Sequence, residues 1–214
     1  MMRNKLSVLT GLLLLLAGCT SFLPGQGPPP RLFTLSPKTT FSEAVVDAPR
    51  VGWQLVVEPP YAPQSLNATR IALMISPMRL DQYARANWTD RAPVLVQDLM
   101  VQSFDSTRKI MAVGRESVGV RPDYVLKTEL RDFQGEVIAP DLHRVRVRMA
   151  ARLVRMPQRI IVASEDFQAE VEVAPQQMEN VVAGFDEALG KVLKRLVDWT
   201  LRAGEADWRR RDRS

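Results

Sequence analysis

The chain has 214 residues, of which 25% are charged and 46% belong to the nine apolar types, and its formal net charge is +5. These proportions are ordinary for a globular protein, and they exclude a disordered chain, a collagen-like fibre and a polytopic membrane protein. One Cys and one His are present, so no disulfide forms within the chain and no Cys/His zinc site can be assembled. A Ser-His-Asp or Cys-His catalytic arrangement would have to use His143.

The first 19 residues have the pattern of a bacterial lipoprotein signal. Arg3 and Lys5 precede an apolar stretch, residues 6–17, which is shorter than the roughly 20 residues of a membrane span but fits a signal-peptide core. The stretch ends in Leu-Ala-Gly-Cys at 16–19, which resembles a lipobox. We predict a signal peptide over residues 1–18 and acylation of Cys19; an uncleaved anchor helix is the alternative. Thr20, in place of an Asp, favours the outer membrane, with the protein facing the periplasm.

The segments on either side of the predicted domain differ from it in composition. Residues 19–30 combine the lipidated Cys with a Pro- and Gly-rich run, which predicts an extended tether of roughly 3 Å per residue, or about 30 Å in all. The folded domain is expected over residues 31–203. Residues 204–214 are predicted to be a basic flexible tail, either a solvated terminus or a contact for anionic lipid headgroups or an acidic partner.

Short strands and one helix are expected in the first half of the domain. Alternation and turn residues predict strands at 31–35, 53–58, 71–76 and 110–113, with 78–83 also compatible with extended structure. Residues 91–104 have the pattern of a helix, which Thr89 or Asp90 can cap.

Three long strands and a long helix are expected in the second half. The strands are predicted at 124–133, 142–155 and 159–173. One face of 142–155 carries Arg and one face of 159–173 carries acidic residues, so these two strands should pair as an antiparallel hairpin. An apolar stripe from Met178 to Trp199 predicts a helix buried on the sheet rather than lying on a membrane, because its polar face carries both charge signs.

This order of elements predicts the fold class. We expect a single α/β domain of α+β type, with a mixed, largely antiparallel sheet and two main helices packed on it.

Motifs for catalysis or cofactor binding are not found. His143 lies beside Arg144 at the start of a basic-faced strand, and we expect a surface histidine without a catalytic role. There is no Gly-rich phosphate loop and no GxSxG. Ion pairing accounts for the acidic pairs of 159–173. The sequence therefore predicts a protein that is not an enzyme, with no cofactor and no metal, and its periplasmic address argues against a nucleic-acid partner.

Several short motifs, in order along the chain, resemble the ABC-type transport auxiliary lipoprotein family, whose best-known member is paraquat-inducible protein C. The most specific is Tyr83–Asp90, an Arg/Trp/acidic segment that leads into a helix. The similarity runs from Phe33 to about Leu201, and its other motifs are Phe33–Pro37, Asp123–Leu126, Leu130–Glu136 and Phe185–Leu189. One departure is that Arg91 and Ala92 intervene between the acidic residue and Pro93.

The resemblance implies a non-enzymatic part of a lipid-transport system. Family members accompany mammalian-cell-entry (MCE) proteins, an inner-membrane permease and its ATPase, and the system moves phospholipids or other hydrophobic molecules across the Gram-negative envelope. The lipoprotein would be held to the membrane by N-terminal acyl chains and would dock the periplasmic MCE protein. A ring-shaped homo-oligomer is compatible with this role, since MCE proteins form rings.

Arg85, Trp88 and Asp90 are the candidate partner-contact residues. The alternative is structural, with Trp88 packed under the helix N-terminus, Asp90 capping the helix and Arg85 paired to Asp90. Two other functions stay open: a structural envelope lipoprotein that acts without a transporter, and a periplasmic enzyme or its inhibitor.

Overall fold

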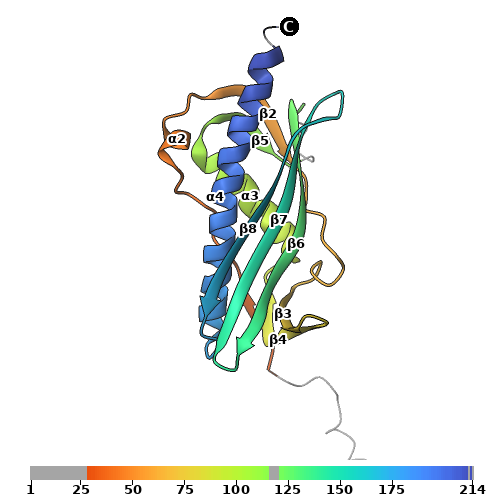
Figure 1. Cartoon of the computed structure of the whole chain (residues 1–214), viewed down its shortest axis with the longest axis vertical. Helices are drawn as coiled ribbons and strands as arrows, with labels where there is room; N and C mark the ends of the chain where they lie inside the picture. The colour runs from red at the N-terminus through yellow and green to blue at the C-terminus, as the bar shows by residue number, and fades with distance from the viewer. Residues whose placement is uncertain (1–27, 116–120, 212, 214) are drawn as a thin grey trace, which may run out of the picture. The chain divides into compact units, whose positions relative to one another are not determined.

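The computed structural model describes residues 28–115, 121–211 and 213. Within these ranges the chain forms a mixed sheet of eight strands with two long helices and one short helix (Figure 1). The strands are β1 (Arg31–Phe33), β2 (Val51–Val57), β3 (Arg70–Ser76), β4 (Arg79–Trp88), β5 (Ile110–Gly114), β6 (Tyr124–Ala139), β7 (Leu142–Arg155) and β8 (Ile160–Val173). The helices are α2 (Glu43–Val46), α3 (Ala92–Thr107) and α4 (Met178–Arg211).

Strand β6 is the centre of the sheet. Along one side it pairs antiparallel with β7, which in turn pairs antiparallel with β8. Along the other side it pairs in parallel with β2 near its beginning and with β3 near its end. Strand β5 adds to β2, while β4 and then β1 add to β3. The predicted mixed sheet, antiparallel in its second half, is confirmed.

The predicted charged hairpin is also present. In the β7–β8 register, Arg144 lies opposite Glu172 and Arg146 lies opposite Glu170. The guanidinium of Arg146 donates to Glu170 Oε1 at 2.9 Å and lies 3.1 Å from Glu136 Oε1 on β6. Opposite charges across neighbouring strands therefore favour this register, as the alternation predicts.

Both long helices contribute to one large core. Alternate residues of β2 and β6 point into it, among them Trp53, Leu55 and Leu126, and they pack with apolar residues of α3 and α4. The intervening residues point to the other face, where Val56, Val125 and Val154 form a small separate cluster. Apart from this cluster, the second face of β6, β7 and β8 is mostly charged.

Helix α4 continues beyond the predicted end of the domain at residue 203, and the expected flexible tail is helical up to Arg211. Gly204 lies against the ring of Trp53, so closely that a Cβ there would fall 2.7 Å from it. One turn further on, Asp207 is buried. These contacts hold the last turns of α4 on the sheet.

Helix α3 differs from its prediction at both ends. It starts at Ala92 and extends to Thr107, and its first turn has no side-chain cap. The carboxylate of Asp90 instead accepts a hydrogen bond from the backbone N–H of Arg91 at 2.6 Å, so the predicted capping by Asp90 or Thr89 is wrong. Pro93 in the first turn favours helix initiation because its φ is already helical.

Candidate functional site

The three candidate contact residues occupy different environments. Trp88 is buried, and its ring packs against Phe133 of β6 and Phe185 of α4 at centroid distances of 5.6 and 5.1 Å. Arg85 and Asp90 are exposed. Trp88 is thus a core residue that packs against the first half of α4. Cys19 lies outside the described residues.

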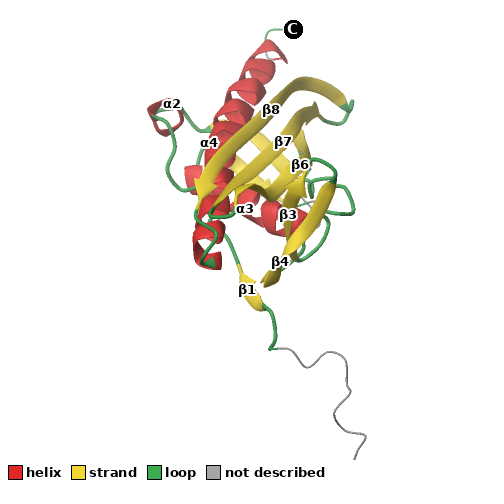
Figure 2. Ribbon diagram, turned by 60° about the horizontal axis from the view of Figure 1, so that its bottom comes forward, coloured by secondary structure: helices red, strands yellow, loops and turns green. Residues whose placement is uncertain are grey.

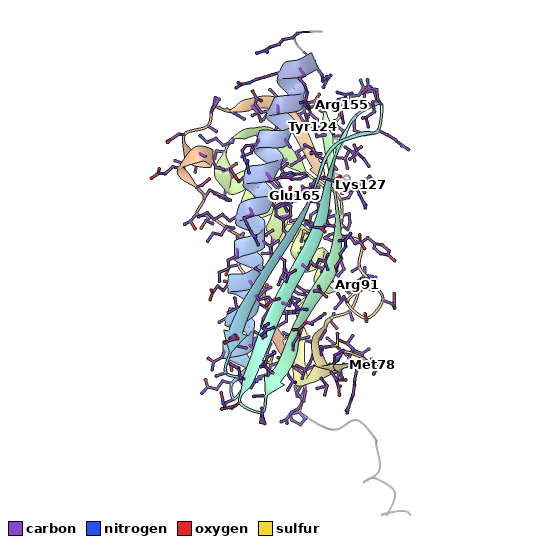
Figure 3. All side chains as sticks on the ribbon, viewed as in Figure 1. Met78, Arg91, Tyr124, Lys127, Arg155 and Glu165 are labelled. Atoms are coloured by element: carbon purple, nitrogen blue, oxygen red, sulfur yellow. The ribbon has the colours of Figure 1, made fainter. Side chains whose placement is uncertain are left out.

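The two ends of the sheet can be assigned from the strand directions. The turn that joins β6 to β7 lies at one end, together with the β3–β4 turn, because β3 runs parallel to β6. We call this the proximal end, since Arg31, the first residue of β1, lies nearer to it than Phe33 does. The β7–β8 turn and the last turns of α4 lie at the other, distal end; in Figure 3 Met78 lies at one end and Tyr124 and Arg155 near the other.

A groove opens at the distal end on the charged face of the sheet. Its volume is about 560 Å³, and the apolar cluster of Val56, Val125 and Val154 forms its floor together with Met156. Charged and exposed apolar side chains surround the floor: Glu58, Lys127, Arg159 and Ile161. Lys127 pairs with Glu58 at 2.7 Å. The groove therefore has a solvent-exposed rim of both charge signs around a small apolar floor.

No local pattern in the sequence predicts this groove. Its one signal is Val125, an apolar residue on the face of β6 that otherwise carries Lys127, Glu129 and Arg131. Val56 and Val154 come from strands that are distant in sequence, and only the register of the sheet brings them beside Val125.

A buried polar network closes the distal end under α4. The Tyr124 hydroxyl donates to Asp207 Oδ2 at 2.8 Å, and Arg155 Nη1 donates to Asp207 Oδ1 at 3.1 Å. Burial raises the pKa of the Tyr124 phenol, so it remains a proton donor at neutral pH. The carboxylate oxygens of Asp207 are occupied by these donors, which indicates a structural role.

His143 is not the surface residue that the sequence predicts. It is buried, and its Nδ1 lies 2.8 Å from the hydroxyl of Tyr83 on β4. Tyr83 in turn covers Gly135, where a Cβ would fall 2.2 Å from the phenol oxygen. The small residue on β6 thus creates the space that the Tyr83–His143 pair fills, and the pair joins β4 to β7.

The buried imidazole makes stability depend on pH. Burial lowers the pKa of His143 below its ordinary value of about 6.5. The unfolded chain therefore binds more protons than the folded chain just below pH 6.5, and the free energy of unfolding should fall as the pH drops through this window. Urea unfolding at about pH 7.5 and about pH 5.5, on either side of the ordinary histidine pKa, measures the effect. His143→Gln should remove that part of the difference; an unchanged pH dependence in this variant would contradict the assignment.

Two further properties of the described residues bear on the site. Among the residues that the structure describes, no group of three or more His, Cys, Asp or Glu side chains is placed to hold a metal ion. None of the described helices is long and apolar enough to cross a membrane.

Comparison with known proteins decides the family. The family model described as "ABC-type transport auxiliary lipoprotein component" matches residues 33–197. The chain belongs to this family. As an auxiliary lipoprotein of ABC-type transport it is membrane-anchored, and its family implies a non-catalytic role.

Solved structures and one curated relative agree in part with this assignment. A crystal structure of a Xanthomonas campestris protein of the DUF330 family is 28% identical, with a TM-score of 0.77, and the match covers 84% of this chain and 99% of that one. A second solved protein, 12% identical with a TM-score of 0.57 over 79% of this chain and 97% of that one, shares the fold alone. A protein of Bradyrhizobium diazoefficiens is 32% identical over 117 residues, which are 54% of the present chain. The match spans only 31% of that relative's length.

Proposed function

We propose that this auxiliary lipoprotein is the outer-membrane docking component of an MCE-type system that moves phospholipids or other hydrophobic molecules across the envelope. In this role Cys19, freed by removal of residues 1–18, carries the acyl chains, and residues 19–30 form the tether. The domain from residue 31 onwards holds the periplasmic MCE protein, which connects it to the permease and the ATPase.

The difference between the two ends of the domain supports this proposal. The first residue of β1 points toward the proximal end, whereas the groove lies at the distal end. Helix α4 has 34 residues and is about 50 Å long. Its basic last turn, at the distal end, therefore lies about 50 Å from its first turn. A surface at the distal end, away from the first residues of the domain, suits a periplasmic protein better than a lipid headgroup.

The groove has the composition of a small protein contact. An apolar floor within a polar rim is the usual anatomy of such an interface. Exposed Arg159 adds positive charge beside Ile161, so we propose a partner segment with an apolar anchor and acidic neighbours. Arg85 and Asp90 remain proposed as secondary contacts, because both side chains are exposed.

Crosslinked pull-down of the acylated protein from native membranes tests the proposal, with proteins and lipids identified by mass spectrometry. We expect an MCE protein with its permease and ATPase. Ile161→Asp should lower their recovery about fivefold or more, as for an apolar contact residue replaced by a charge. Met111→Asp is the matched control, since Met111 is a similarly exposed apolar residue on β5, outside the groove.

Two results would count against the docking role. Recovery of no transporter subunit in mild detergent would favour a structural envelope lipoprotein that acts without a transporter. Equal loss with Ile161→Asp and Met111→Asp would keep the transporter but remove the groove as its contact.

A further inference from the structure

The proximal end carries an exposed apolar tip. Met78, in the turn between β3 and β4, is 98% exposed, and Leu80 just after the turn is 39% exposed. Ile138, 46% exposed, lies two residues beyond Glu136, which pairs with Met74 of β3. The end of β3 and the end of β6 therefore bring these three apolar side chains to one edge, where Figure 3 shows Met78 projecting from the turn.

The direction of β1 relates this tip to the preceding chain. Arg31 pairs with Ala86 and Phe33 with Trp88, so β1 runs parallel to β4. Strand β4 begins at the tip, so Arg31, the first residue of β1, is the end of β1 nearer to the tip. Figure 2 shows β1 at the same end of the domain as β3 and β4.

The lengths are also compatible. Arg70 pairs with Asn87, beside β1, and Ser76 pairs with Arg79 at the turn. These six steps along β3 extend the tip about 20 Å beyond β1, at about 3.3 Å per residue. The eleven residues between Cys19 and the domain, 20–30, would span about 30 Å if extended. A bilayer that holds acyl chains on Cys19 is thus within reach of the tip.

We propose that the tip formed by Met78, Leu80 and Ile138 inserts into the surface of the phospholipid bilayer that carries the protein's own anchor. The neighbouring Arg79 side chain is 69% exposed, and its pair with Asp81 is long, at 3.6 Å. This largely exposed guanidinium can bind lipid phosphate while the three apolar side chains enter the interface. The proposal depends on acylation of Cys19 but not on the transport role.

A single label on the full acylated protein tests this. Acylation consumes the thiol of Cys19, the one cysteine of the chain, so Met78→Cys introduces a unique reactive thiol for an environment-sensitive fluorophore. The protein is reconstituted into phosphatidylethanolamine and phosphatidylglycerol vesicles, after mass spectrometry of the mature N-terminus has established acylation. Met111→Cys, another exposed methionine but at the distal end, is the matched control.

We expect the label at 78 to shift its emission to shorter wavelength and to be quenched by lipids with a shallow nitroxide, as for a group about 5–10 Å into the headgroup region. The label at 111 should behave as in water. Adding Leu80→Asp and Ile138→Asp to the labelled Met78→Cys protein should abolish the shift. Water-like emission at both positions overturns the proposal, as does a shift at 78 that appears only when solubilised envelope proteins are added.

Discussion

Replacing Trp88 with alanine is expected to lower the free energy of unfolding by about 3–5 kcal/mol, the range for truncating a large buried aromatic residue. The indole is 1% exposed and meets Phe185 of α4 edge-on, with an interplanar angle of 82°. Its removal leaves a cavity between the sheet and the first half of α4. Urea unfolding of the domain measures the loss.

The control variants separate packing from partner contact. Trp88→Phe should cost less than Trp88→Ala, because part of the ring contact remains. Arg85→Ala removes an exposed side chain of the same strand and should leave stability within about 0.5 kcal/mol of the wild type. If Trp88→Ala were as stable as the wild type but failed to recover the MCE protein, the buried position of the ring would be contradicted.

The long strands could be predicted because their pattern is local. In 142–155, Arg residues alternate with apolar residues such as Val145 and Val147, and in the structure the apolar set is buried while the Arg set meets acidic side chains. Because one face of the strand is in the core and the other is in water, the alternation predicts both the strand and its pairing register. Short elements such as α2, with four residues, carry no such repeat.

The environment of single residues could not be predicted, because it depends on distant strands. His143 was expected on the surface because Arg144 follows it, but successive residues of a strand point to opposite faces. The burial of His143 is set by Tyr83, sixty positions away on β4. Similarly, Trp88 is covered by Phe185 and Phe133, which no local spacing places beside it.

The end of α4 has the composition of a tail because its buried side is not apolar there. The buried residues Leu196, Thr200, Gly204 and Asp207 continue the helical spacing of four and three residues. Because Thr, Gly and Asp are not apolar, the stripe of apolar residues does not include these positions. The spacing itself, continued past Ala203, was the signal that could have extended the helix.

Asp207→Ala should therefore destabilise the domain, by about 3 kcal/mol, as for the loss of one partner from a buried ion pair. It would leave the Tyr124 hydroxyl without its carboxylate and Arg155 without its counter-charge, beside the ring of Trp53. Asp207→Asn should cost less, because the amide oxygen still accepts a hydrogen bond. A double-mutant cycle with Tyr124→Phe should give a coupling of about 1 kcal/mol.

The neighbouring residues provide the contrast. Arg209 is exposed and pairs with Glu205 one turn before it, so Arg209→Ala should change stability by about 0.5 kcal/mol or less. Equal, small effects of Asp207→Ala and Arg209→Ala would show that the last turns of α4 are the flexible tail that the composition suggests. A large effect confined to Asp207 would instead show that the folded domain needs these turns, because one buried carboxylate joins α4 to β6 and β7.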